Sequence, residues 1–198
     1  MIYSYRIEQA IRAAAVLHEG QVRKGKVPFP YLTHLVSVML IVSDYTNEED
    51  VIIAALLHDT LEDTDYTERE LRADFGNTVT EYVLHVSEQD GSEAVVADWK
   101  ERKEQYAKLL DKAPEGSLIV SAADKIHNMR SIIEEYYTEH ERFMEEFGGS
   151  LEDRVRMYQE ISNVLNRRLQ NDIIHEFNHV FDEYKKFITY VQKEAQHS

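Results

Sequence analysis

The sequence contains no cysteine, which excludes disulfides, thiolate metal sites and cysteine nucleophiles and suits a reducing cytoplasm. It also contains no run of 18 apolar residues, so we predict no membrane span. Residues 1–20 mix charged with apolar residues, as an amphipathic helix does and a signal peptide does not. Basic residues are scarce, 22 against 37 acidic ones, and the net charge is −15. Because nucleic-acid polymers are bound through many lysine and arginine contacts, we expect none as a partner.

Proline and glycine are also few, at three and seven residues, and no alternating strand pattern is sustained. Apolar residues recur at helical spacing along most of the chain, which predicts an all-α fold. We expect helices at 5–19, 31–44, 48–62, 67–74, 77–88, 94–111, 116–136, 140–147, 151–168 and 172–195. The 198 residues fit one domain, 1–198, with a catalytic core at 1–147 and a C-terminal helical extension at 148–198.

The segment AALLHDTLEDTD, residues 54–65, carries the strongest chemical signal. Its apolar start indicates a packed helix, and a buried cluster of charges there needs a compensating ion. Imidazole with carboxylate suits Mn, Fe, Zn or Co. On one continuous helix His58 and Glu62 are i,i+4 neighbours, and so are Asp59 and Asp63. We therefore predict His58 and Asp59 as metal ligands, with Glu62 and Asp63 as general acid and base. The alternative is an exposed helix end rich in acidic residues.

Two further residues could complete the metal shell. His34 lies in the first turns of an apolar helix, where a core or capping histidine is the commoner explanation. Asp124 has apolar neighbours on both sides and needs a partner of opposite charge. That partner is either a metal ion or one of two nearby cations, Lys125 and Arg130.

The loop 20–31 carries Arg23, Lys24 and Lys26, the only basic cluster that precedes the metal motif. In an acidic chain such a loop could bind a small anionic substrate, or it could simply be solvated.

A second metal pattern occurs near the C-terminus, where His175, Glu176 and His179 match the H-E-x-x-H helix of zinc proteases. No obvious third ligand follows it, so it is the weaker candidate.

The order H…HD…D resembles the signature of the HD metal-phosphohydrolase superfamily. Four segments match more closely: HEGQVRKG…PYLTH (18–34), AALLHDTLEDT (54–64), FG (75–76) and AADKIHNMRS (122–131). In order and spacing they resemble the hydrolase domain of RelA/SpoT proteins, and most of all the small alarmone hydrolases, over about residues 5–135. The resemblance implies an HD-domain helical bundle with extra C-terminal helices. It also implies hydrolysis of the 3′-pyrophosphate of (p)ppGpp to GDP or GTP and pyrophosphate.

The resemblance also implies a role for each matching residue. Four correspond to the ligands of one Mn²⁺ ion: His34, His58, Asp59 and Asp124. Two correspond to the acidic pair that activates water and protonates the leaving oxygen: Glu62 and Asp63. Four correspond to nucleotide contacts: Arg23 at the base, Lys24 near phosphate, Asn128 at the nucleoside and Ser131 near the base or ribose.

Some features depart from the family pattern and keep alternatives open. Leu35 stands where the family often has proline, and the loop RKGKVPFPY is longer than the shortest family versions, so guanine specificity is open. An HD hydrolase of another phosphorylated nucleotide, such as a dNTP, a nucleoside monophosphate or NADPH, is the main alternative. A nucleotide-sensing or scaffold protein without turnover and a zinc protease are the others. The oligomeric state is open, a homo-oligomer included.

Overall fold

The computed structural model describes residues 3–23, 27–87, 99–138 and 151–195. Within these ranges the chain is helical, and its single β pairing is an isolated bridge between Val22 and Pro30. The prediction of an all-α fold is confirmed. The helices are α1 (Tyr5–Leu17), α2 (Leu32–Tyr45), α3 (Glu49–Leu57), α4 (Thr60–Asp63), α5 (Glu68–Phe75), α6 (Asn77–Leu84), α7 (Trp99–Leu110), α8 (Glu115–Thr138), α10 (Leu151–Arg168) and α11 (Ile173–Ala195).

Most predicted helices occur within a few residues of their expected bounds. The prediction of one helix at 48–62 was wrong, because the chain forms α3 and α4 with a break at His58 and Asp59. The helix expected at 140–147 and the seam at 148–150 lie outside the described residues. The division into a core and a C-terminal extension stays a prediction.

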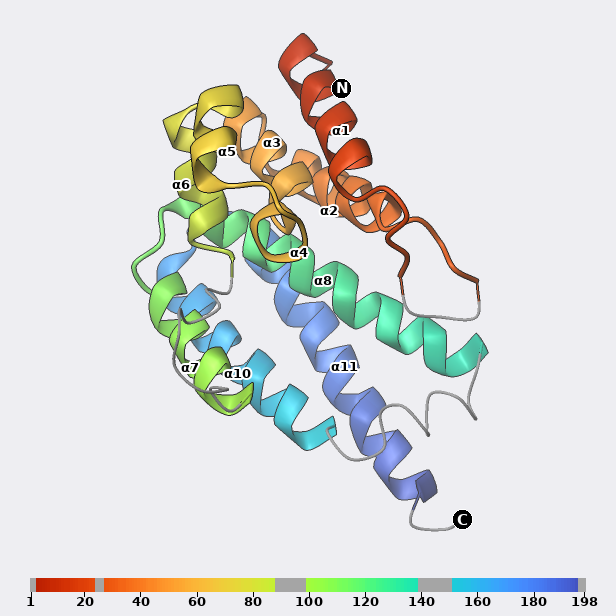
Figure 1. Cartoon of the computed structure of the whole chain (residues 1–198). Helices are drawn as coiled ribbons and strands as arrows, with labels where there is room; N and C mark the ends of the chain where they lie inside the picture. The colour runs from red at the N-terminus through yellow and green to blue at the C-terminus, as the bar shows by residue number, and fades with distance from the viewer. Residues whose placement is uncertain (1–2, 24–26, 88–98, 139–150, 196–198) are drawn as a thin grey trace.

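Helix α8 is the centre of the fold and packs against α2, α3, α6, α10 and α11. In Figure 1 it crosses the molecule with α11 beside it, while α1, α2 and α3 lie on one side and α7 and α10 on the other. The first three turns of α8 are almost entirely buried, which explains their run of small and aliphatic residues. A polar side chain from this part of α8 is therefore held in a rigid interior.

The junctions between helices follow local chemistry. Thr67 caps α5 in a capping box, in which its hydroxyl accepts from the backbone N–H of Glu70 and the Glu70 carboxylate accepts from that of Thr67. Gly76 then separates α5 from α6 with φ of 90°, a left-handed conformation that favours glycine. These two features direct α6 back onto α3.

The C-terminal helices are joined to the rest of the molecule by polar contacts as well as by packing. The Tyr45 hydroxyl, at the end of α2, donates to the Glu176 carboxylate, and Arg130 of α8 pairs with the same carboxylate at 2.7 Å. The Asn171 amide donates to the Tyr45 carbonyl at 2.9 Å. Among the described residues, none of the helices combines the length and apolar character needed to cross a bilayer.

Candidate metal centre

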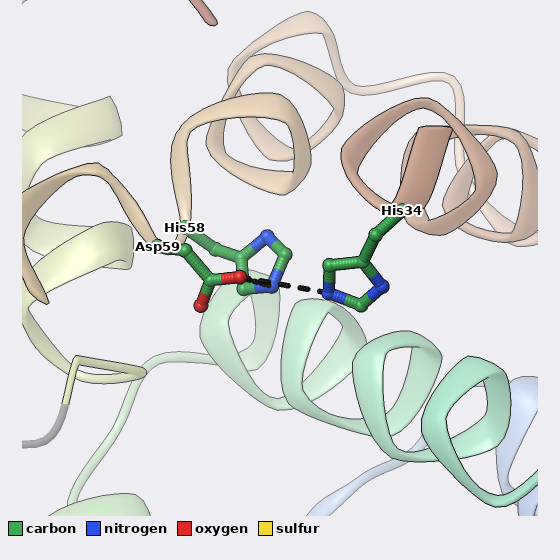
Figure 2. A group of neighbouring side chains, drawn as sticks. All are labelled: His34, His58 and Asp59. Atoms are coloured by element: carbon green, nitrogen blue, oxygen red, sulfur yellow. Dashed lines mark ion pairs between the residues drawn. The ribbon is translucent and has the colours of Figure 1, made fainter. Parts of the chain in front are cut away.

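The break between α3 and α4 positions two neighbouring side chains of the candidate site. The His58 ring nitrogen Nδ1 lies 2.8 Å from the Ala55 carbonyl, and the Thr60 hydroxyl donates to the Leu57 carbonyl at 2.6 Å. In a continuous helix both carbonyls would accept backbone N–H groups, so these side chains compete with the helical pattern. The predicted i,i+4 placement of His58 and Glu62 on one helix is therefore wrong. Asp59 occupies the turn and points to the same place as His58 (Figure 2).

Four predicted ligands meet at one point, contributed by α2, the α3–α4 turn and α8. Nε2 of His34 lies 3.5 Å from Oδ2 of Asp59 and 3.3 Å from Oδ1 of Asp124. Nε2 of His58 lies 3.1 Å and 3.7 Å from the same two oxygens. Figure 2 shows His34 reaching from its helix toward His58 and Asp59. The structure thus brings together residues that are 90 positions apart in sequence.

This arrangement fits a divalent cation. One ligand atom from each of His34, His58 and Asp59 lies within 4.8 Å of the others. Nε2 of His58 is buried and has no hydrogen-bond partner among the described residues. A buried polar atom of this kind is costly unless another group, such as a metal, satisfies it. Two imidazoles and two carboxylates suit the divalent transition metals.

Neighbouring side chains hold the two carboxylates in place. The Tyr31 hydroxyl donates to Oδ2 of Asp59 at 2.7 Å. Lys125 donates to Oδ2 of Asp124 at 2.6 Å, and the Asn128 amide donates to Oδ1 of Asp124 at 2.6 Å. Such outer contacts orient metal ligands and tune their basicity. Lys125 is thus the cation that pairs with Asp124.

The charges of the cluster stabilise one another. Burial raises the pKa of Asp124, but Lys125 and the two imidazoles outweigh it and hold that pKa well below the usual range. Burial likewise opposes ionisation of Asp59, yet His58 and His34 lower its pKa further than burial raises it. For His58, burial lowers the pKa, and the two carboxylates more than reverse this effect. Without a metal, the cluster therefore keeps both carboxylates ionised and favours a protonated His58.

The predicted acidic pair lies on α4, one turn beyond Asp59. Both Glu62 and Asp63 are exposed. Although the residue is exposed, neighbouring atoms partly desolvate the Asp63 carboxyl and raise its pKa, and the charge of Asp59 raises it further. The Gln21 side chain donates to the Asp63 carbonyl at 2.7 Å, which ties the end of α4 to the basic loop.

Two of the predicted nucleotide contacts, Arg23 and Asn128, adjoin the cluster. The Arg23 guanidinium donates to the Asn128 side-chain oxygen at 3.0 Å and lies 5.8 Å from the centre of the Tyr31 ring. The Ser131 hydroxyl lies 3.5 Å from a ring nitrogen of His127. Lys24 lies outside the described residues. The arrangement places the Arg23 guanidinium beside the cluster, in a position to bind an anionic substrate.

Sequence reasoning did not assign a role at this site to Tyr31 or His127. Tyr31 lies three residues before His34, and His127 three residues after Asp124, so each shares a helical face with a predicted ligand. Nδ1 of His127 lies 2.9 Å from Nδ1 of His34. This spacing of three residues from a predicted ligand was the sequence signal for Tyr31 and His127, because their contacts form only when the helices pack together.

The H-E-x-x-H pattern on α11 does not form a comparable site. Its glutamate, Glu176, is engaged by Tyr45 and Arg130, while His175 and His179 are exposed. Across the described ranges, His34, His58 and Asp59 form the only such grouping of ligand atoms close enough to hold one metal ion.

Comparison with known proteins identifies the family of this chain. The family model described as "HD domain" matches residues 10–148. This chain belongs to the HD-domain family. The match includes all four residues of the cluster and ends before α10, so α10 and α11 lie beyond it.

Relatives within the family have named activities. The chain is 36% identical over 127 residues to a "GTP pyrophosphokinase" of Streptomyces coelicolor, covering 64% of this chain and 15% of that protein. It is 33% identical over 126 residues to the mouse "Guanosine-3′,5′-bis(diphosphate) 3′-pyrophosphohydrolase MESH1", covering 63% of this chain and 68% of that protein. A solved metazoan ortholog of SpoT shares the fold, with a TM-score of 0.75, 24% identity, and coverage of 92% of this chain and 97% of that one. The chain spans less than a fifth of the bacterial relatives, as in the Streptomyces case, and most of MESH1.

Proposed function

We propose that this HD-domain protein is a metal-dependent hydrolase that removes the 3′-pyrophosphate of (p)ppGpp, giving GDP or GTP and pyrophosphate. The observation that carries the proposal is the convergence of His34, His58, Asp59 and Asp124 on one point. The named activity of MESH1, which the chain matches over most of its length, supports the choice of substrate.

In this proposal the four residues of the cluster bind one Mn²⁺ ion. A divalent ion held there supplies Lewis acidity, which polarises a phosphoryl oxygen and lowers the pKa of water. The protein's part is to fix the ligands: Tyr31 orients Asp59, and Lys125 and Asn128 orient Asp124. Rigid positioning by buried helices keeps the site ready before substrate arrives.

Glu62 and Asp63 carry the proton transfers. One carboxylate takes a proton from the attacking water, and one carboxylic acid gives a proton to the leaving oxygen. Their exposure at the end of α4 supports this role, because they can reach a substrate that enters from solvent. The raised pKa of Asp63 makes it the better candidate for the acid.

Arg23, Lys24, Asn128 and Ser131 bind the nucleotide. The Asn128 side chain orients Arg23, and the Arg23 backbone N–H donates to the Phe29 carbonyl at 2.9 Å. A planar guanidinium suits both stacking on a base and pairing with phosphate. The cytoplasmic location and a homo-oligomeric state stay predictions.

The deciding experiment incubates Mn²⁺-loaded protein with ppGpp, dNTPs, a nucleoside monophosphate and NADPH, and resolves the products by chromatography. We expect ppGpp to yield GDP and pyrophosphate. Orthophosphate or triphosphate released from another nucleotide, with ppGpp intact, would support the alternative HD hydrolase. If a metal-replete sample leaves every nucleotide intact, the enzyme proposal fails and a sensing or scaffold role gains support. The control His175→Ala should retain full turnover, whereas a zinc protease based on α11 requires that residue.

A further inference from the structure

His127 contacts the candidate metal centre through one of its ligands. It lies on α8, one helical turn after Asp124, and its ring packs against His34 with centroids 4.8 Å apart. The two Nδ1 atoms are 2.9 Å apart, which is hydrogen-bonding distance. A hydrogen bond between two ring nitrogens requires that one carries the proton and the other accepts it.

The direction of this bond follows from the proposed function, on which this inference rests. Nε2 of His34 is the nitrogen that faces Asp59 and Asp124, so it is the one that binds the metal. A metal-bound nitrogen has no proton, and a neutral imidazole must then carry its proton on the other nitrogen. Nδ1 of His34 is therefore the donor, and Nδ1 of His127 is the acceptor.

The two histidine ligands are held in different ways. Nδ1 of His58 lies 2.8 Å from the Ala55 carbonyl, a backbone acceptor in the same segment of chain. Nδ1 of His34 depends instead on a side chain from α8, the helix that also carries Asp124. The contact couples the ligand of α2 to the ligand of α8, and it can be removed by substitution, unlike a backbone carbonyl.

We propose that His127 is a positioning residue for the metal: its Nδ1 accepts the ring proton of His34 and so fixes the tautomer and orientation in which His34 binds the ion. It acts through His34 and is not itself a ligand of the ion. Loss of an outer-shell partner of this kind typically weakens metal binding by about 10- to 100-fold.

The test compares substitutions that differ in where they place an acceptor. In His127→Asn the side-chain oxygen can occupy the position of Nδ1, so we expect Mn²⁺ affinity within about threefold of wild type. In His127→Phe the ring remains but the acceptor is lost, and in His127→Gln the amide extends past it. Both should bind Mn²⁺ about 10- to 100-fold more weakly. Affinity is measured with Mn²⁺ alone, from the electron paramagnetic resonance signal of the free ion, with thermal unfolding as the check on folding.

A packing role and a hydrogen-bonding role for His127 predict opposite orders of Mn²⁺ affinity among these variants. If His127 only fills space, Phe is tolerated and Asn is the harmful change, which would overturn the inference. If Phe does not fold, the comparison of Asn with Gln still decides, because both are polar and only Asn keeps the acceptor in place. The matched control is His179→Phe, the same change on an exposed face of α11, which should leave affinity unchanged.

A further variant separates this inference from the proposed function. His58→Ala should abolish tight Mn²⁺ binding. If it does while His127→Phe and His127→Gln bind like wild type, the role of His127 is wrong and the metal site stands. If His58→Ala leaves Mn²⁺ binding intact, the metal site itself is wrong, and the inference falls with it.

Discussion

The candidate metal centre and the C-terminal helices are both buried, but opposite kinds of side chain fill them. At the centre, His34 and His58 are only 1% and 3% exposed, and they face the buried carboxylate of Asp124 and the partly buried carboxylate of Asp59. Between α10 and α11 the buried side chains are large and mostly apolar, with Phe177 fully covered and the rings of Tyr158 and Tyr184 5.3 Å apart. One region encloses charge and the other excludes water from aromatic surface.

The two regions should therefore contribute differently to the stability of the molecule. Burying charged groups opposes folding unless each is paired, so the metal centre adds little stability of its own. Burying aromatic rings is strongly favourable and adds contact energy between the rings. We infer that α10 and α11 stabilise α8, the helix that also carries Asp124 of the cluster. Substitutions should separate these two contributions.

The largest effect should come from His58→Ala. We expect turnover to fall by more than the roughly 10²- to 10⁴-fold that an acid or base contributes, because the ligand set that holds the ion is incomplete. The variant should still fold, as circular dichroism can show. Residual activity near wild type would contradict the placement of the metal.

Glu62→Gln should lower kcat by about 10²- to 10⁴-fold while Mn²⁺ affinity stays close to wild type. The carboxylate is exposed on α4 and is not one of the four proposed ligands, so its loss should affect chemistry alone. Steady-state kinetics with a parallel Mn²⁺ titration measures both quantities. A large loss of metal affinity would instead make Glu62 a ligand.

Phe177→Ala should lower the stability of the protein and leave the metal centre intact. Removal of a fully buried aromatic ring leaves a cavity and should lower the free energy of unfolding by about 3–5 kcal/mol. Below the unfolding transition, Mn²⁺ affinity should not change, because the ring belongs to α11 and not to the cluster. Urea unfolding, with metal binding measured in the absence of denaturant, tests both parts. The comparison between the two regions fails if metal affinity falls together with stability.

Acidification should weaken Mn²⁺ binding. Once His58 becomes protonated, the affinity should fall by about tenfold for each pH unit. Burial lowers the pKa of His58, but Asp59 and Asp124 raise it by more, so its protonated form persists to higher pH than in an ordinary histidine. A proton and a metal compete for the same nitrogen, and affinity therefore decreases as pH falls through that raised pKa. Mn²⁺ titrations across a pH series measure the slope. An affinity that rises on acidification would contradict this account.

Arg130→Gln should have the smallest effect, at most about 1 kcal/mol of stability. Its side chain is half exposed, and the Glu176 carboxylate that it pairs with keeps the Tyr45 hydroxyl as a partner. Thermal unfolding should show this small loss with turnover unchanged. A loss of activity in this variant would place Arg130 at the substrate instead.

The helices were predictable because their signals are local. Apolar spacing determined where α2, α8 and α11 form, and the pairing of Thr67 with Glu70 marks the start of α5. The break at His58 was not predictable from periodicity, because it depends on side chains that take over backbone carbonyls. A continuous helical pattern of apolar residues does not indicate that competition.

The four proposed ligands could be selected from the sequence, but their mutual geometry could not. His34 and Asp124 were candidates that each had a structural alternative in their own surroundings, and the family resemblance favoured the role of metal ligand. The contact between His34 and His127 joins residues 93 positions apart, and no spacing rule reports it. Outer contacts such as Tyr31 with Asp59 also come from the packing of helices and need the folded structure.

The most direct test of the central claim is a crystal structure of the Mn²⁺-soaked protein, with anomalous diffraction recorded at the manganese edge. We predict one strong anomalous peak, in contact with Nε2 of His34, Nε2 of His58 and carboxylate oxygens of Asp59 and Asp124. A peak elsewhere, or a fully loaded crystal with no peak at this cluster, would contradict the account.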